Sequence, residues 1–324
     1  MKILVTGCAG FIGSHVCEKL LKKQGVFVIG VDNYDPYYNV KIKKDNINML
    51  KRKYPNFEFV RADIRDMNVI NEWKPKKIIH LASMAGVRNS IKNPELYFDV
   101  NVKGFIRLLE ECITYDVEQI VYASSSSVYG LNDSVPFKET DQITRCNSPY
   151  ACSKMSMELL ASTYSQLYDL NLIGLRFFTV YGPRGRPDMA PYKFLTSIMN
   201  GEKFKKYGDG SSMRDYTYID DIVDGILKAL DNEKEVKCEV YNLGNSKPVT
   251  LNKFIKLCEK VCEKEAKYEQ IEEQMGDVPI TYSSILKAKR DLGYFPKTDL
   301  ETGLKEMRKY LLTIDTKKKN YTYN

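Results

Sequence analysis

The sequence predicts an α/β protein built on a doubly wound parallel sheet, with a smaller mixed α/β lobe towards its C-terminus. Three observations predict this. Short apolar runs alternate with helical patterns through the first half of the chain, a glycine-rich turn follows the first run, and beyond about residue 180 the elements become shorter and mixed. We expect a first domain over 1–180, with parts of 215–245 returning to it, a second lobe over 181–315 and a disordered tail over 316–324.

Strands and helices are expected in an order that suits such a sheet, which binds ligands at the carboxyl ends of its strands. In the first domain, strands are expected at 2–6, 26–31, 57–61, 76–81, 118–124 and 172–178, and helices at 14–24, within 34–56, around 94–115 and at 148–169. In the second lobe, strands are expected near 214–219, 240–243 and 267–271, and helices near 191–200, 220–230, 250–264, 284–291 and 300–312.

Composition excludes several classes of function. A chain of 324 residues, 43% of them hydrophobic, is long enough for a large domain with a smaller partner. Its formal net charge of +7 comes from scattered lysines, with no arginine-rich arm, so no nucleic-acid site is expected. No apolar run could span a bilayer, and no signal peptide precedes the first strand. The 8 cysteines lack CxxC and zinc spacing, which indicates reduced thiols, a cytoplasmic location and no metal site.

The first candidate site is the turn after the first expected strand. Gly7, Gly10 and Gly13 form a GxxGxxG pattern between a strand and a helix, the context in which a helix N-terminus binds a pyrophosphate. The second strand ends in Asp32, whose carboxylate suits both ribose hydroxyls of NAD and repels the 2′-phosphate of NADP. Three lysines within 41–44 weigh against that preference. A tight strand–helix turn with a capping acid is the alternative.

The second candidate site is the segment 148–154. Ser148 suits a helix N-cap and Pro149 its first turn, so Tyr150 and Lys154 stand at i and i+4 on one helix face. A free phenol titrates near pH ~10, and an ammonium one helical turn away lowers that pKa. Tyr150 is therefore a candidate base for a substrate hydroxyl. An ordinary surface helix is the alternative.

Two further polar features accompany the expected strands. Strand 118–124 runs into a serine segment, Ser124–Ser127, whose hydroxyls can bond a substrate hydroxyl and pass its proton towards Tyr150. Without Tyr150 and Lys154, a simple serine-rich turn would be the preferred interpretation of that segment. Asn101 lies in an otherwise apolar helix, where bridging backbone groups beside an active site and serving as a plain polar residue fit equally well.

Together these motifs resemble the extended short-chain dehydrogenase/reductase family of nucleotide-sugar enzymes, over nearly the whole chain to about residue 312. The motifs are Gly7-x-x-Gly10-x-x-Gly13, Asp32, Ser125 and Tyr150-x-x-x-Lys154. The resemblance implies a Rossmann domain with tightly held NAD, a lobe that grips a nucleotide diphosphate, and oxidation of C4 of a sugar to a ketone. It also implies a homodimer through the helices near 94–115 and 148–169.

The resemblance also assigns roles to residues. The catalytic residues would be Tyr150, Lys154, Ser125 and Ser127, with either serine on the C4 hydroxyl. The NAD-binding residues would be Gly7, Gly10, Phe11, Ile12, Gly13, Asp32, Asn33, Asp63, Ile64, Leu81, Ala82, Ser83, Asn101, Ser124, Tyr150, Lys154 and Phe178. The residues that bind the UDP-sugar would be Arg88, Ser125, Thr179, Arg186, Arg214 and Asp277.

Three local sequence features resemble those of UDP-glucuronate 4-epimerases. Ser125–Ser127 lacks the glutamate that dehydratases and UDP-glucuronate decarboxylases of the family carry there, the segments 32–38 and 84–88 are similar, and so is the loop 181–190. In that subfamily the arginine matching Arg186 meets the sugar carboxylate, to which a guanidinium offers a planar two-donor fork. Arg184 departs from the usual tryptophan. Arg186 as an exposed loop cation or a diphosphate ligand is the alternative.

The remaining matches concern the nucleotide. Arg214 matches the diphosphate-binding arginine and Asp277 an acid that binds the uridine ribose, while Thr179 stands where UDP-galactose epimerases have asparagine. Arg88 is a weaker candidate for the anionic ligand, and an ion pair between Arg214 and Asp277 is the alternative. The expected activity is interconversion of UDP-glucuronate and UDP-galacturonate in the supply of polysaccharide precursors. Its rivals are a UDP-glucose or UDP-N-acetylglucosamine 4-epimerase, a UDP-glucuronate decarboxylase and a non-catalytic NAD-binding scaffold.

Overall fold

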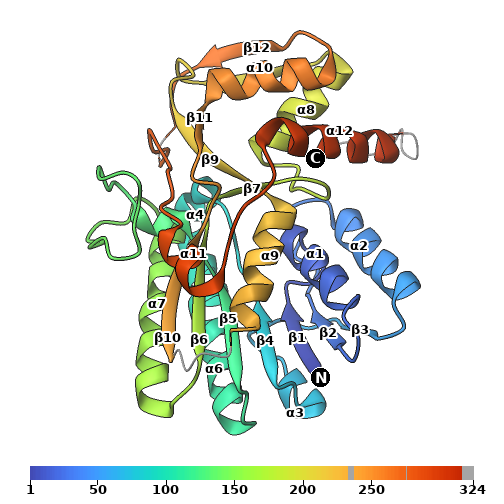
Figure 1. The fold of residues 1–324 in the computed structure, drawn as a ribbon, viewed down its shortest axis with the longest axis vertical. Coiled ribbons are helices and arrows are strands. Elements are labelled where there is room, and N and C mark those ends of the chain that lie inside the picture. The colour runs from blue at the N-terminus through green and yellow to red at the C-terminus, as the bar shows by residue number, and fades with distance from the viewer. Residues whose placement is uncertain (233–236, 275, 316–324) are drawn as a thin grey trace.

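A seven-stranded, wholly parallel sheet forms the centre of the first domain (Figure 1). The computed structural model describes residues 1–232, 237–274 and 276–315. The strand order is β10-β6-β5-β4-β1-β2-β3, as in doubly wound folds. The strands are β1 (Lys2–Thr6), β2 (Phe27–Val31), β3 (Phe57–Val60), β4 (Lys77–His80), β5 (Gln119–Ser125), β6 (Leu172–Phe177) and β10 (Cys238–Leu243).

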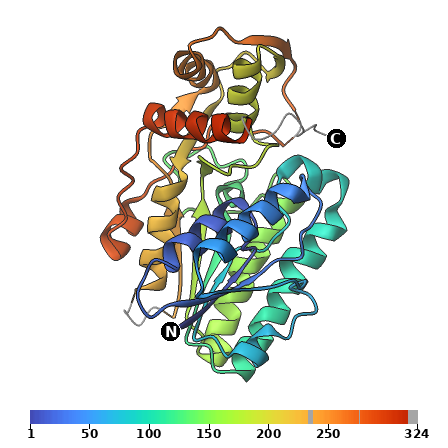
Figure 2. The same ribbon diagram turned by 90° about the vertical axis from the view of Figure 1, so that its right-hand side faces the viewer.

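Helices cover both faces of this sheet, because its strands are apolar on both sides (Figure 2). Successive strand residues point to opposite faces, so Ile3 and Val5 pack in one core cluster while Leu4, between them, packs in the other. The first cluster lies under α1 (Phe11–Leu20), α2 (Val40–Lys53) and α9 (Ile219–Leu230). The second lies under α3 (Val69–Trp73), α6 (Gly104–Thr114) and α7 (Pro149–Tyr168).

The C-terminal lobe lies beyond the carboxyl ends of the strands (Figure 1). It contains two small sheets, of order β11-β9-β7 and β12-β8, and several helices. Its strands are β7 (Thr179–Tyr181), β8 (Lys203–Tyr207), β9 (Met213–Tyr218), β11 (Pro248–Thr250) and β12 (Lys267–Ile271). Its helices are α8 (Ala190–Asn200), α10 (Leu251–Cys262) and α12 (Leu300–Asp315). Between β9 and β11 the chain returns to the first domain as α9 and β10, and α11 (Leu286–Leu292) packs beside them.

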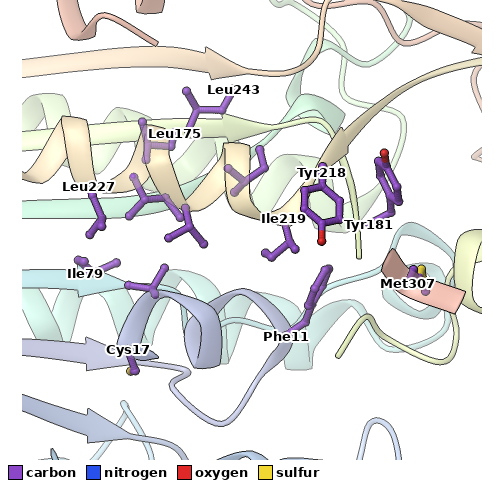
Figure 3. Packing of buried hydrophobic residues seen from close by; sticks show 14 of the residues in the cluster. Phe11, Cys17, Ile79, Leu175, Tyr181, Tyr218, Ile219, Leu227, Leu243 and Met307 are labelled. Carbon is purple, nitrogen blue, oxygen red and sulfur yellow. The ribbon is translucent and has the colours of Figure 1, made fainter. Parts of the chain in front are cut away.

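One continuous apolar cluster joins the lobe to the first domain (Figure 3). It runs from Ile79 and Leu227 in the first domain to Tyr181 of β7 and Met307 of α12 in the lobe. Burial of this surface stabilises the relative position of the two parts. None of the described helices is long and apolar enough to cross a membrane.

The structure differs from the expected elements mainly where elements are short. The region 94–115 divides into α5 (Pro94–Tyr97), a π-helical segment η1 (Phe98–Lys103) and α6. Strands β7, β8 and β11, with helices α3 and α4 (Val87–Lys92) and the 3₁₀ turn η2 (Ser126–Tyr129), have too few residues to show a period. Helix α1 begins at Phe11 because Gly10 serves as its N-cap. The expected disordered tail lies outside the described residues.

Candidate active site

A cavity of about 870 Å³ lies between the carboxyl ends of the main sheet and the C-terminal lobe. Its lining includes every residue for which a cofactor, catalytic or substrate role is predicted, except Asn101. Residues of β2 and β5, and those that directly follow β1 and β4, meet there because the carboxyl ends of parallel strands share one edge. The fold thus gathers into one space side chains that lie far apart in the sequence.

The glycine turn packs its backbone closely against neighbouring backbone at the N-terminus of α1. Gly7 has a φ of +70°, and a Cβ added there would lie 2.8 Å from the backbone of Ala82. A Cβ at Gly13 would lie 2.1 Å from the carbonyl oxygen of Gly7. Gly10 caps the helix without a side chain, so no side-chain acceptor satisfies the first backbone N–H groups. These features fit the pyrophosphate of a dinucleotide.

Asp32 lies at the end of β2 with 8% of its surface exposed. Its carboxylate accepts hydrogen bonds from the backbone N–H groups of Ala9 (3.2 Å) and Tyr34 (2.8 Å). Burial raises the pKa of this carboxyl, and Lys43 opposes the shift. The ammonium of Lys43 itself donates to the carbonyl of Asp35 at 2.8 Å. Two accepted bonds leave lone pairs on Asp32 for ribose hydroxyls.

A second acid, Asp63, lines the cavity beside Asp32 in a rigid arrangement. Arg65 grips it with two hydrogen bonds of 2.8 and 2.9 Å, and the amide of Asn33 donates to it at 2.9 Å. The bonds from Arg65 hold the pKa of Asp63 well below its usual range. Arg65 also lines the cavity and was not predicted; its position two residues after Asp63 was the available signal.

The catalytic candidates lie where α7 begins and β5 ends. The hydroxyl of Ser148 accepts from the backbone N–H of Ala151 at 3.1 Å, which confirms the expected N-cap. Tyr150 follows in the first turn and bonds the hydroxyl of Ser125. Ser125 in turn accepts from the N–H of Ser127 at 3.1 Å. The phenol, both serines and the glycine turn thus line one cavity.

The expected effect of Lys154 on Tyr150 is wrong for the side chains described. Burial raises the pKa of Tyr150, and the groups that lower it are Ser125 and Arg186. The ammonium of Lys154, 1% exposed, instead donates to the carbonyl of Ala123 at 2.8 Å. Spacing places the lysine on the correct helix face, but its long side chain reaches β5. Burial lowers the pKa of Lys154 to about 7, against the opposing effect of Glu158.

A buried ionic network supports the catalytic helix from behind. Glu158, one turn after Lys154, pairs with Arg176 of β6 through hydrogen bonds of 3.0 and 2.7 Å. The hydroxyl of Ser124 also donates to Glu158. Ser124 therefore lines the cavity with its hydroxyl already bonded to a carboxylate. Glu158 and Arg176 were not predicted, since a helical acid and a strand arginine carry no motif.

Asn101 does not reach the cavity, so its predicted contact with the cofactor is corrected. It is fully buried in η1, where its amide accepts from the N–H of Met84 (2.7 Å) and donates to the carbonyl of Met84 (3.0 Å). It also donates to the hydroxyl of Ser153 on α7 at 2.9 Å. Asn101 thus bridges backbone groups, as one of the two interpretations expected, and connects the segment after β4 to the catalytic helix.

The lobe side of the cavity carries two arginines, Arg88 and Arg214, near two acids, Asp277 and Glu273. Arg88 bonds Asp277 at 2.8 Å and lies 4.6 Å from the centre of the Tyr207 ring. The alternative pairing of Arg214 with Asp277 is therefore wrong. Arg214 donates to the carbonyl of Met213 at 2.9 Å, and Asp277 contributes to its electrostatic environment. The guanidinium groups of Arg88 and Arg214 supply N–H donors of the kind that suit a diphosphate.

The two arginines of the loop after β7 take opposite directions. Arg184, at φ +60°, bonds Glu18 of α1 at 2.8 Å and does not line the cavity. Arg186 lines the cavity, and its Nε and Nη2 donate to Asp188 at 3.0 and 2.6 Å. The fork expected for a substrate carboxylate is thus occupied on one edge by Asp188. Asp188 and its neighbour Tyr37 were not predicted.

Comparison with known proteins agrees with this site. Residues 4–307 match the family model described as GDP-mannose 4,6 dehydratase. The chain is 42% identical to the UDP-glucuronate 4-epimerase of Thermodesulfobacterium geofontis, over 93% of each chain. The UDP-glucuronic acid 4-epimerase of Bacillus cereus, solved with UDP-glucuronic acid and NAD, superposes with a TM-score of 0.93 at 34% identity, covering 97% of this chain and 100% of that one. The UDP-glucose 4-epimerase of Thermotoga maritima superposes with a TM-score of 0.87 at 34% sequence identity, covering 97% of this chain and 99% of that one.

The fold and the cavity define a dinucleotide-binding enzyme of the short-chain dehydrogenase/reductase type that modifies nucleotide sugars. Within that class, the chain belongs to the GDP-mannose 4,6-dehydratase-like epimerase family, which includes its relatives named UDP-glucuronate 4-epimerase.

Proposed function

We propose that this chain is an NAD-dependent 4-epimerase that interconverts UDP-glucuronate and UDP-galacturonate through a 4-keto intermediate. The observation that carries the proposal is the meeting of Tyr150, Ser125 and Arg186 in one cavity with the glycine turn. A base, a hydroxyl partner and a carboxylate-binding cation are thereby present together, and the serine segment supplies no additional acid.

The cofactor side of the cavity fits NAD. The turn of Gly7, Gly10 and Gly13 would hold the pyrophosphate, and Asp32 would bind the adenosine ribose. Asp63 would bind the adenine edge, and the hydrogen bonds from Arg65 and Asn33 keep its carboxylate in one orientation. Bound NAD supplies the chemistry of taking a hydride from C4 of the sugar and returning it. Leu81, Ala82, Ser83 and Phe178 would enclose it, and Lys154 would hold the nicotinamide ribose.

Tyr150 acts as the base in this proposal. The C4 hydroxyl lies at Ser125 and Tyr150, and its proton passes to the phenolate as C4 becomes a ketone. Ser125 lowers the pKa of Tyr150, and so does the charge of Arg186, against the effect of burial. Ser127, bonded to Ser125, fixes the orientation of that hydroxyl. The same groups return the proton after the keto sugar has turned.

The substrate side holds two anionic parts of UDP-glucuronate. Arg88 and Arg214 hold the diphosphate, and Asp277 accepts from the uridine ribose. Arg186 contacts the carboxylate, and Thr179 stands beside the sugar. With the diphosphate held, the keto sugar can rotate in the cavity and present its other face, as an epimerase requires.

The decisive experiment is an NMR assay of UDP-glucuronate with purified protein and no added cofactor. A mixture with UDP-galacturonate supports the 4-epimerase and indicates that NAD is retained through purification. A UDP-pentose would instead indicate the decarboxylase. No change with UDP-glucuronate, before and after adding NAD, would contradict the proposal and leave UDP-glucose and UDP-N-acetylglucosamine to test, then the non-catalytic scaffold.

Arg186→Ala separates the acidic substrate from the neutral ones. A guanidinium–carboxylate contact contributes roughly 1.5–3 kcal/mol, so the variant should lose about tenfold or more in kcat/KM with UDP-glucuronate. With a neutral UDP-hexose the loss should be smaller, because only the effect of the Arg186 charge on the pKa of Tyr150 is removed. Equal losses with both substrate types would argue against a contact with the carboxylate.

The chain would act as a homodimer in a cytosol-like compartment. Two leucines of α7, Leu159 and Leu167, are exposed together with Tyr168 and with Phe98 of the adjoining η1, and a second copy would cover this face. None of the 8 cysteines, all within the described residues, forms a disulfide, which supports a reducing environment. The product is of the kind used to build surface polysaccharides.

A further inference from the structure

The guanidinium of Arg186 is held by the protein itself before any ligand is considered. Its Nε and Nη2 donate to the two oxygens of Asp188 at 3.0 and 2.6 Å, a side-on fork that defines the plane of the group. Only 19% of the Arg186 side chain is exposed. Burial tends to raise the pKa of Asp188, but Arg186 outweighs it and the pKa is lowered, so the carboxylate stays ionised.

A third residue, Tyr37, supports this pair from the other domain. Its ring centre lies 5.1 Å from the guanidinium carbon of Arg186, and its hydroxyl donates to Asp188 at 3.4 Å. The backbone N–H of Tyr37 bonds the side chain of Asp35 at 2.8 Å, which fixes the turn after β2. Gly86, at φ +104°, makes space for the Tyr37 hydroxyl, since an added Cβ would lie 2.5 Å from it.

One edge of the guanidinium remains for a ligand. Arginine has five N–H donors, and the side-on fork uses two of them. The end-on edge is formed by Nη1 and the second N–H of Nη2. Among the described residues, the one further side chain that hydrogen-bonds the guanidinium is Tyr37, through its hydroxyl. Arg186 lines the cavity and its charge acts on Tyr150. A sugar with its C4 hydroxyl at Tyr150 carries its C5 carboxylate on the neighbouring ring atom, within reach of that edge.

We propose that Asp188, supported by Tyr37, is a positioning residue that fixes the plane of Arg186 and so decides whether the 4-keto sugar keeps its carboxylate. This inference rests on the proposed function. In the 4-keto acid, the C5–C6 bond breaks when it aligns with the π system of the ketone. CO2 leaves, the electron pair of that bond passes into the enolate, and C5 takes a proton from water.

The decarboxylation balances in atoms and electrons without a further oxidant or reductant. The two electrons removed from C4 are returned by the same bound dinucleotide, so UDP-glucuronate plus one proton gives a UDP-pentose and CO2. A guanidinium of fixed plane holds the carboxylate close to the plane of the ring, where the C5–C6 bond is misaligned for cleavage. A guanidinium free to rotate would not impose that geometry.

The test is the product ratio of Asp188→Asn with UDP-glucuronate, followed by NMR. The amide keeps the size of the side chain but loses the charge and one of the two acceptors. We expect the fraction of UDP-pentose over UDP-galacturonate to rise roughly tenfold, which corresponds to about 1.4 kcal/mol between the two barriers. Tyr37→Phe should move the ratio in the same direction by less, and Asp188→Glu should restore it in part.

A matched control removes a different anchor of the same loop, from helix α1. Glu18→Gln removes the carboxylate from the Arg184 ion pair, which anchors the loop on the side that faces away from the cavity. This variant should leave the product ratio unchanged. An equal rise in UDP-pentose with Glu18→Gln would show that general loop rigidity controls the ratio, and would overturn the role given to Asp188.

The outcomes also separate this inference from the function on which it rests. If the wild-type protein epimerises UDP-glucuronate and Asp188→Asn shows the wild-type product ratio, the positioning role is wrong and the proposed function stands. If the wild-type protein leaves UDP-glucuronate unchanged, both are overturned. If Asp188→Asn fails to fold, the product ratios of Tyr37→Phe and Asp188→Glu test the inference instead. Wild-type product ratios in both variants would overturn the positioning role of Asp188.

Discussion

Lys154 holds its amine in the interior of the protein beside the glycine turn. Only 1% of its surface is exposed, and its ammonium donates to the backbone carbonyl of Ala123. Burial disfavours the charged form, and Glu158 compensates only in part, so the pKa is lowered to about 7. A residue retained at such a cost to stability is typical of a functional site.

The stability cost of Lys154 gives a prediction with a defined sign. The unfolded chain keeps this proton up to about pH 10.4, whereas the folded chain loses it near pH 7. Between these values the unfolded state binds more protons, so the contribution of Lys154 to stability improves as the pH rises. Lys154→Met should therefore stabilise the dinucleotide-free protein by a few kcal/mol at or below pH 7, with the gain shrinking towards pH 10. Urea unfolding across this range tests it, and a variant less stable than wild type at pH 7 would contradict it.

Removal of the Tyr150 hydroxyl should separate chemistry from binding. Tyr150→Phe keeps the ring and its edge contact with Tyr97, but loses the group that exchanges a proton with the sugar. We expect turnover to fall by about 10²–10⁴-fold, with bound NAD retained. Tyr168→Phe, at the exposed end of the same helix, serves as the control and should keep the wild-type rate. Wild-type turnover in Tyr150→Phe would remove Tyr150 from the mechanism.

At the scale of elements, the network of Ser124, Glu158 and Arg176 ties β5, α7 and β6 together. Arg176 also lies 4.8 Å from the centre of the Tyr129 ring. Because Ser124 precedes Ser125, and Glu158 follows Lys154 by one turn, this network sets the separation of the serine segment from the catalytic helix. A buried pair of this kind is satisfied only while both ions are present.

Breaking this pair should therefore cost more than replacing it. Glu158→Gln leaves Arg176 charged and buried, and we expect it to destabilise the protein by about 3–5 kcal/mol. The double variant Glu158→Met/Arg176→Met removes both charges and should recover much of that loss. Urea unfolding midpoints of the three proteins measure the difference. A double variant less stable than Glu158→Gln would show that the charges stabilise the fold beyond satisfying each other.

At the scale of the whole molecule, the exposed face of α7 and η1 is where assembly would occur. Leu159 and Leu167 are 64% and 66% exposed, eight residues apart on one side of α7. Leu159→Glu/Leu167→Glu should convert the dimer to a monomer, because burial of two carboxylates at an interface is unfavourable. Sedimentation velocity measures the mass, and Leu286→Glu, at a 71% exposed position of α11, is the control. A wild-type monomer would contradict the expected assembly.

Much of the fold was predictable because it depends on near neighbours in the chain. The apolar runs of β1, β2, β5 and β6 are continuous, and the helix of Tyr150 has a capping serine followed by proline. Short elements were missed, among them β7 and the π-helical η1, since three to six residues define no period. The site residues were predicted through motifs, and Arg65 and Glu158 carry none. Tyr37 and Asp188 lie within the similar segments 32–38 and 181–190, but no role was predicted for them.

The sequence by itself determined the parallel sheet, the glycine turn before α1, and the placing of Tyr150 and Lys154 on one helix face. These follow from local spacing and backbone preference. Only the tertiary structure decided which group each charged side chain meets. Arg88 bonds Asp277 across 189 residues, Arg184 bonds Glu18 across 166, and Lys154 reaches Ala123 rather than Tyr150. The physical reason is that ion pairs and burial depend on distances between segments that are remote in the chain, which local patterns do not encode.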